Sequence, residues 1–312
     1  MRTFIFSVLM GIFLLGFSSC AQQESSILPA TTSNLSEESL KAYTDVQDSI
    51  AVLNSNLMQK GTSRSFFSRL FNSICKVVVA DCVGAFNGLI NGDNIWNSAT
   101  SSSINAARKE AKPYLYELES EMSTRAVSRN TVSMTDLINA ENNLDGLILA
   151  DNTKKLTSID SLGYYHNKII NDSFTENDDA NYWFSLDDKK LVEKINTEVI
   201  KIVPQSLNNS DIKTDATIKF CNFIGTAVSE STNAQELLNK TKKEYVNLSN
   251  SINILAQYVE GMENVSTQEE WDKYSKDIVR IISNSNLDDK QKESLKAGII
   301  VGYASSKLWK DE

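Results

Sequence analysis

The segment of residues 65–93, "SFFSRLFNSICKVVVADCVGAFNGLINGD", constrains the fold more than any other part of this chain. Its length and apolar content predict one long helix that is apolar on nearly every side. A helix of that kind has to be enclosed by other elements, so we expect it at the centre of the body. Ala80, Gly84 and Gly88 recur at four-residue spacing, which would let a neighbouring backbone approach closely.

The alternative for this segment is insertion into a membrane. Arg69, Lys76 and Asp81 lie within it, and a charged residue costs about 2.5–3.5 kcal/mol at the centre of a membrane helix. We therefore expect a buried packing helix. Because burying an isolated charge is expensive, Asp81 should take a partner or have a raised pKa.

The rest of the chain is also typical of helices, because apolar residues recur at three- and four-residue spacing and no sustained alternation predicts a strand. Asn233 with Glu236 and Ser266 with Glu269 have the spacing of helix-capping pairs, and the last helix starts at Asp288. We predict an all-α multi-helix bundle of about eight to ten helices. The ranges that we expect to be helical are 36–59, 64–90, 97–123, 134–150, 159–171, 186–203, 212–230, 234–262, 267–284 and 288–309.

Residues 172–188, "DSFTENDDANYWFSLDD", are the most loop-like stretch inside the body. This stretch could separate two helical subdomains. Tyr182, Trp183 and Phe184 would favour burial and would anchor the loop to the bundle. Otherwise we expect residues 36–312 to form one all-α domain.

The N-terminal residues predict a lipid anchor. After the basic Arg2, the fourteen residues Phe4–Phe17 hold one polar side chain, Ser7, and they are too few for a bilayer-spanning helix of about 20 residues. The next residues complete Phe17-Ser18-Ser19-Cys20, which resembles the lipobox of bacterial lipoproteins. The resemblance implies that residues 1–19 are a signal peptide and that Cys20 carries a diacylglyceryl group and usually a further acyl chain such as palmitate.

Ordinary secretion is the alternative, with cleavage after Ala21, because Ser19-Cys20-Ala21 also satisfies the small-residue rule. Two or three acyl chains on Cys20 would hold the chain firmly, since each buried CH₂ contributes about 0.8 kcal/mol. Residues 20–35 are rich in Ser, Thr and Gln and would form a flexible tether. We therefore expect an outer-membrane lipoprotein of the cell envelope that faces the periplasm or the cell surface.

The charge balance limits the possible partners. Removal of residues 1–19 takes away Arg2 and leaves 30 basic against 40 acidic residues, a net charge of −10. An acidic chain without a Lys/Arg cluster does not favour nucleic acid, and it does not favour docking onto anionic lipid. The expected partners are the membrane, through the lipid on Cys20, and a protein of the envelope.

Candidate catalytic residues are few. His166 is the only histidine, so a site with two or three histidine ligands is excluded within one chain. Asp81, His166 and Asn167 form either a possible site or a structural polar core. Asp81 could act as an acid, a base or a ligand, whereas a structural Asp81 would bond to a helix end or a basic group, and His166 and Asn167 would bond to backbone.

Three cysteines, Cys75, Cys82 and Cys221, remain once Cys20 is lipidated. On one helix Cys75 and Cys82 would lie about 10.5 Å apart along the axis, too far for a disulfide, so we expect buried free thiols. The sequence holds no P-loop, dinucleotide fingerprint, Gly-x-Ser-x-Gly elbow or His-Glu-x-x-His motif. We therefore expect no metal and no cofactor.

Three segments together resemble a family. "VVVADCVGAFNG" (77–88), "SLGYYHNKII" (161–170) and "VGYASSKLWK" (301–310) are similar to signatures of uncharacterised helical lipoproteins from the Bacteroidota. Members carry a Gly/Ala-rich continuation after the first motif, and here it is the more polar "LINGDNIWNSATSSSINAARK", so any role that depends on those glycines is in doubt. The resemblance implies no activity. It implies that Asp81, Gly84, His166, Asn167 and Trp309 share a core or a site.

Three hypotheses on function follow. The first is a lipid-anchored binding or interaction module, which the anchor, the tether and the lack of catalytic motifs favour over an enzyme. The second is a hydrolase or metal-dependent enzyme that uses Asp81 and His166 and needs both in one pocket. The third is an envelope structural or assembly factor whose apolar central helix rearranges to pack with a partner.

Overall fold

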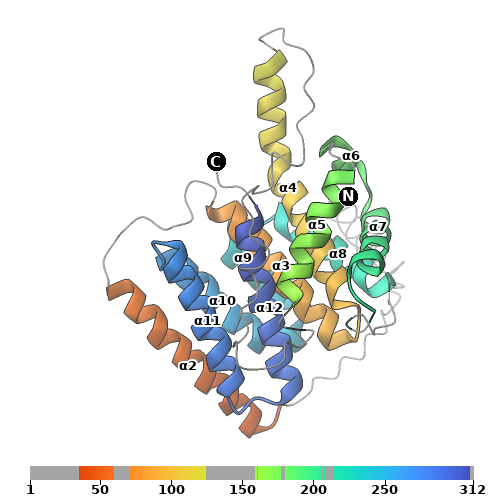
Figure 1. Cartoon of the computed structure of the whole chain (residues 1–312). Coiled ribbons are helices and arrows are strands. Elements are labelled where there is room, and N and C mark those ends of the chain that lie inside the picture. The colour runs from red at the N-terminus through yellow and green to blue at the C-terminus, as the bar shows by residue number, and fades with distance from the viewer. Residues whose placement is uncertain are drawn as a thin grey trace, which may run out of the picture. The chain divides into compact units, whose positions relative to one another are not determined.

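The computed structural model describes residues 35–59, 71–123, 159, 161–176, 180–205, 207 and 214–309. These residues form α-helices and one short 3₁₀-helix and hold no β-strand, which confirms the all-α prediction (Figure 1). The signal peptide, Cys20, the tether before Leu35 and the helix expected at 134–150 lie outside the described residues. The elements are α2 (Glu37–Gln59), α3 (Phe71–Asn91), α4 (Ile95–Ser123), α5 (Leu162–Glu176), α6 (Ala180–Ser185), α7 (Asp188–Ile202), α8 (Thr214–Ser229), α9 (Ala234–Glu244), η3 (Val246–Leu248), α10 (Ser249–Asn264), α11 (Gln268–Asn284) and α12 (Asp289–Leu308).

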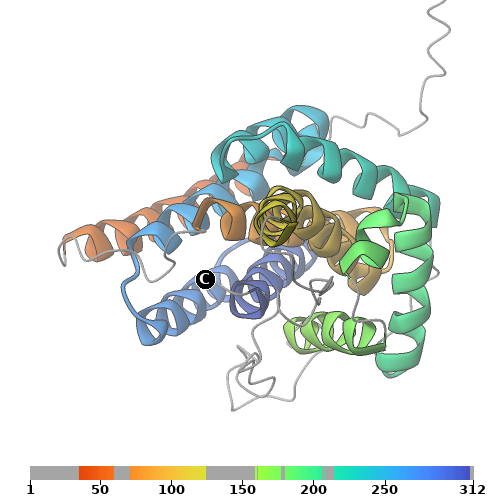
Figure 2. The same cartoon turned by 90° about the horizontal axis from the view of Figure 1, so that it is seen from above.

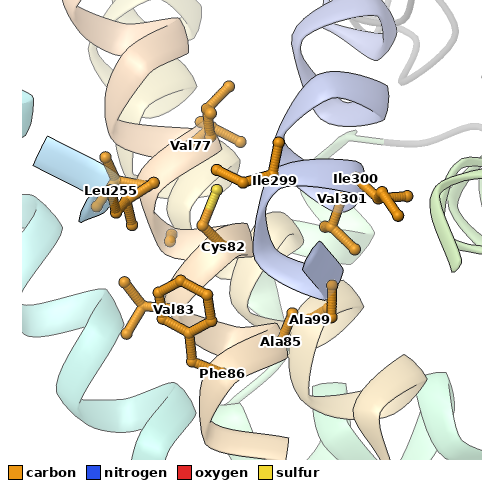
Figure 3. Packing of buried hydrophobic residues seen from close by; sticks show 14 of the residues in the cluster. Val77, Cys82, Val83, Ala85, Phe86, Ala99, Leu255, Ile299, Ile300 and Val301 are labelled. Carbon is orange, nitrogen blue, oxygen red and sulfur yellow. The ribbon is translucent and has the colours of Figure 1, made fainter. Parts of the chain in front are cut away.

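Helix α3 is the central helix, as its apolar sequence predicts. It packs mainly against α4 and α12 and also contacts α8, α9 and α10. Among the described residues, Ser73–Asn91 is the one segment whose length and hydropathy would suit a membrane span, and most of it is buried inside the helical body, as in the core helix of a soluble protein. Figure 3 shows the packing of α3 (Val77, Cys82, Val83, Ala85, Phe86) with α4 (Ala99), α10 (Leu255) and α12 (Ile299, Ile300, Val301).

The small residues of α3 allow α4 to approach, as their spacing predicts. A Cβ atom added to Gly84 would lie 2.8 Å from the carbonyl oxygen of Ser98, and one added to Gly88 would lie 2.7 Å from Cα of Ile95. Contacts that short between carbon and backbone atoms are not tolerated. Glycine at these two positions therefore sets the distance between α3 and α4.

The first half of α4 is buried even though it is largely polar. All residues from 96 to 108 are buried, and several of their polar groups are bonded locally or to neighbouring helices, whereas the hydroxyl of Ser103 and the indole N–H of Trp96 have no hydrogen-bond partner of ordinary geometry among the described residues. The hydroxyl of Ser102 donates to the carbonyl oxygen of Ser98 at 2.7 Å, and Arg108 pairs with Asp188 of α7. In the view from above, α4 runs nearly along the line of sight with α8 beside it (Figure 2).

The prediction of a loop at residues 172–188 is wrong. Helix α5 continues to Glu176, and Ala180–Ser185 form the additional helix α6. Trp183 is fully buried and packs edge-on against Phe174 of α5, with ring centroids 4.9 Å apart. The anchoring role of these aromatic residues is confirmed, and their burial stabilises a helix where the polar composition alone favours a loop.

The single helix predicted at 234–262 is also wrong, because the chain turns at Tyr245 (φ −111°, ψ 71°) between α9 and η3. The Tyr245 ring packs at 5.2 Å from both Phe220 and Phe223 of α8. This contact favours the turn over a continuous helix. Because of this break and of α6, the described residues hold eleven α-helices, one more than the upper end of the expected range.

The helix starts agree with the predicted caps, with one shift. The side chain of Asn233 accepts from the Glu236 N–H at 2.9 Å, and Asp288 starts α12 in a capping box. At α11 the capping residue is Thr267, which accepts from the Glu270 N–H at 3.1 Å, so the predicted Ser266–Glu269 pair is one residue too early.

Candidate functional site

Asp81 lies in the middle of α3 and faces the interior of the helical body. Its carboxyl group is fully buried. Burial raises the pKa of Asp81 well above its usual range, and the neighbouring hydroxyls of Ser305 on α12 and Ser103 on α4 offset part of that rise. Neither hydroxyl makes a hydrogen bond of ordinary geometry with the carboxyl oxygens. Burial therefore favours the neutral form of the Asp81 carboxyl group.

His166 approaches Asp81 from α5. Nε2 of His166 lies 3.7 Å from Oδ2 of Asp81, and both side chains have no exposed surface. The other ring nitrogen, Nδ1, lies 3.3 Å from the hydroxyl oxygen of Thr100 on α4. The structure thus brings Asp81 and His166, which the sequence places on separate helices, into one buried cluster.

The charge state of this pair follows from burial. A distance of 3.7 Å is short enough for an ion pair and too long for a hydrogen bond. Burial, however, lowers the pKa of His166 to about 3 and raises that of Asp81. Both shifts disfavour the charged forms that an ion pair requires. Because neither group reaches water, burial favours the neutral imidazole and disfavours the ionised carboxylate.

Asn167 contributes to packing beside this cluster. Its side-chain N–H donates to the carbonyl oxygen of Ala304 on α12 at 2.9 Å. A Cβ atom added to Gly163 would lie 2.9 Å from Cβ of Ala304, so α5 and α12 are in close contact along this line. Asn167 therefore fixes α5 against α12 through the backbone, as the structural hypothesis for this residue proposes.

The three segments of the family resemblance lie on or beside α3, α5 and α12, and α12 packs against both α3 and α5. Asp81, His166 and Asn167 come together there. Trp309 follows α12 and lies 6.3 Å, ring to ring, from Phe174 of α5. No protein family, curated protein or solved structure matches this chain. The resemblance to Bacteroidota lipoproteins therefore stays a prediction, and the role of the site rests on geometry.

Thr100 and Ser103 were not predicted from the sequence to lie at this site. They belong to the run "SATSSS", which is typical of a solvated helix face or a loop. The only signal that could have found them is position, because both follow the helix on which Asp81 lies. Ser305 is the serine of the third motif, and the sequence did not indicate that it would face Asp81.

The three cysteines among the described residues, Cys75, Cys82 and Cys221, are free and buried, as predicted. Burial raises the pKa of each thiol, that of Cys221 to about 11. Within the described parts of the chain, no three side chains of His, Cys, Asp or Glu are placed to hold a metal ion.

Proposed function

We propose that this chain is a lipid-anchored protein of the cell envelope whose helical body works as a binding module rather than as an enzyme. The observation that supports the binding role is the complete enclosure of the Asp81–His166 pair. This pair involves the only histidine of the chain. A substrate could reach it only if α5 or α12 moved away, whereas a binding module needs only the folded surface.

The anchor rests on the sequence of Phe17 to Cys20. Mass spectrometry of the mature N-terminus tests it directly. We expect a first residue Cys20 that carries two or three acyl chains, and we expect Cys20→Ser to release the protein from the membrane fraction. A mature chain that begins at Gln22 without lipid would contradict the anchor.

The binding role is tested in a strain that lacks the chain. Wild type, Cys20→Ser and Asp81→Asn are expressed in that strain, and native complexes are compared after cross-linking in intact cells. A binding module predicts that Asp81→Asn forms the same complexes and restores the same phenotype as wild type. A folded Asp81→Asn protein that keeps its complexes but loses the phenotype would favour chemistry at Asp81 instead.

A hydrolase is the second candidate, because Thr100, His166 and Asp81 follow one another as a hydroxyl, an imidazole and a carboxyl group. Catalysis of this kind requires an ionised carboxylate that stabilises a protonated imidazole. Burial opposes both charges here. The geometry therefore favours the binding module.

The assembly-factor hypothesis depends on exposure of the apolar central helix. Residues 74–88 of α3 are buried without interruption. Exposing them would separate α3 from both α4 and α12 and would disrupt the core. A surface used in the folded state is the simpler route to a partner.

A further inference from the structure

The polar atoms around Asp81 come from four different helices and face one another in the core. Both carboxyl oxygens of Asp81, the hydroxyls of Ser103 and Ser305, and Nε2 of His166 are buried without a hydrogen-bond partner of ordinary geometry. Groups of this kind are rare in folded proteins, because each unsatisfied buried group costs free energy. Five such atoms in one place indicate a shared arrangement rather than separate defects.

The hydroxyls of Ser103 and Ser305 are not bonded to their own helices. In contrast, the hydroxyl of the neighbouring Ser102 on α4 donates to the carbonyl oxygen of Ser98 at 2.7 Å. Ser103 and Ser305 make no such bond, and both lie beside Asp81 instead. Their hydroxyls are therefore available to donate to the carboxyl group.

One proton on Asp81 would allow the buried polar groups of this cluster to form hydrogen bonds with one another. If Asp81 is protonated, its O–H faces the lone pair on Nε2 of His166, and the carbonyl oxygen of the carboxyl accepts from Ser103 and Ser305. The hydrogen on Nδ1 of His166 then faces the hydroxyl of Thr100. The Asp81–His166 separation of 3.7 Å has to shorten by about 1 Å for this hydrogen bond, and no charge is buried.

We propose that Asp81 carries a proton at neutral pH and donates it towards Nε2 of His166, and that this proton fastens α5 to α3, α4 and α12. The folded body then binds one proton that the unfolded chain releases at that pH. Alkaline pH removes this proton, leaves a buried carboxylate next to a neutral imidazole, and weakens the folded state.

The other groups that face Asp81 do not supply a compensating charge. Helix α4 brings the hydroxyls of Thr100 and Ser103, and α12 brings the hydroxyl of Ser305, none of which ionises at these pH values. Among the described residues, Cys82 on α3 is a further titratable group that interacts with Asp81, and burial together with Asp81 raises the pKa of its thiol. Tyr258 of α10 lies beyond Cys82, and its pKa is raised by burial as well.

The sign of the pH dependence follows from linkage. The pKa of Asp81 is raised on folding, so its contribution to stability is complete below the unfolded value of about 3.9 and is lost as the pH rises towards the folded value. Over that range the equilibrium constant for folding falls tenfold per pH unit relative to a variant that cannot ionise.

The single histidine allows a direct test on the full chain in mild detergent. In a sample labelled with ¹⁵N in histidine, all imidazole signals belong to His166. We expect a neutral ring that carries its hydrogen on Nδ1 and none on Nε2 throughout pH 5–8. A ring that titrates near pH 6.5, a ring that is doubly protonated in this range, or a neutral ring with its hydrogen on Nε2 would overturn the proposal.

The second measurement compares urea unfolding of wild type and Asp81→Asn across the same pH range. The asparagine keeps the shape of the side chain and can donate to Nε2. We therefore expect the equilibrium constant for folding of wild type, relative to that of this variant, to fall tenfold for each unit by which the pH rises. Asp48→Asn, which removes an exposed carboxylate on α2, is the matched control and should run parallel to wild type.

A constant difference between wild type and Asp81→Asn would show that Asp81 is ionised in the folded state and would overturn the proposal. If the difference is constant and sodium or potassium chloride stabilises wild type but not the variant, the cluster binds a small cation instead of a proton. If Asp81→Asn does not fold, the ¹⁵N spectrum of the wild-type chain decides by itself.

Discussion

The hydroxyl of Tyr274 on α11 donates a 2.8 Å hydrogen bond to Oδ1 of Asn54 on α2. The amide group of Asn54 in turn donates to the carbonyl oxygen of Gln257 on α10 at 2.9 Å. One buried asparagine thus joins three helices that are distant in the sequence. Because α2 follows the predicted tether, this contact fixes the start of the body to its C-terminal helices.

Tyr274→Phe should destabilise the folded chain by about 1–3 kcal/mol, because the buried oxygen of Asn54 loses its donor. Urea unfolding measures the change. Tyr182→Phe is the control, since Tyr182 lies partly exposed on α6, and we expect little effect there. Equal effects of the two substitutions would show that the Tyr274–Asn54 bond contributes nothing specific.

Gly302→Ala should destabilise α12 even though alanine favours a helix over glycine by about 1 kcal/mol. The new Cβ would lie 2.5 Å from Sγ of Cys82, and overpacking of a core typically costs about 1–3 kcal/mol. Thermal unfolding of both single variants and of Cys82→Ala/Gly302→Ala forms a double-mutant cycle. We expect Gly302→Ala to be tolerated once Cys82 is alanine, and additive losses would contradict this contact.

The thiols of Cys75, Cys82 and Cys221 should not react with a maleimide in the folded chain at pH 8. All three are buried and their pKa values are raised, so little thiolate is present or accessible. Labelling followed by mass spectrometry should detect modification of these residues only in denaturant. Rapid labelling of any of them under native conditions would place that cysteine at the surface.

His166 should contribute a pH dependence of the opposite sign to that of Asp81. Its pKa is lowered to about 3 by burial, so its contribution to stability is complete above about pH 6.5 and is lost as the pH falls towards 3. Relative to His166→Gln, wild type should lose about 1.4 kcal/mol per pH unit over that interval. Urea unfolding at several pH values checks this slope, and a positive slope towards acid pH would indicate a protonated histidine in the folded state.

Much of the architecture could be predicted because helix formation depends on residues that are close together in the sequence. The apolar surface of residues 74–88, the small residues Gly84 and Gly88, and the caps at Asn233 and Asp288 all follow from spacing along one helix. The expectation of a lipid anchor at Cys20 has the same local origin. These features need no knowledge of which helices are neighbours.

The candidate site could be predicted only in part. Asp81 is identifiable as a carboxyl group in an apolar helix and His166 as the only histidine, but nothing local places them 3.7 Å apart. Nothing in the local sequence indicates that Thr100, Ser103 and Ser305 are buried, as the structure shows them to be. Their positions depend on how α3, α4, α5 and α12 pack.

The sequence by itself determined that this chain is helical, which helix is central and where most helices begin, because periodicity and capping act within a few residues. Only the tertiary structure decided that the chain turns at Tyr245, that Ala180–Ser185 form a helix, and that a carboxyl group and an imidazole share one buried cluster. These features arise from contacts between distant segments. Burial in those contacts changes both the preferred backbone conformation and the preferred protonation state of a residue.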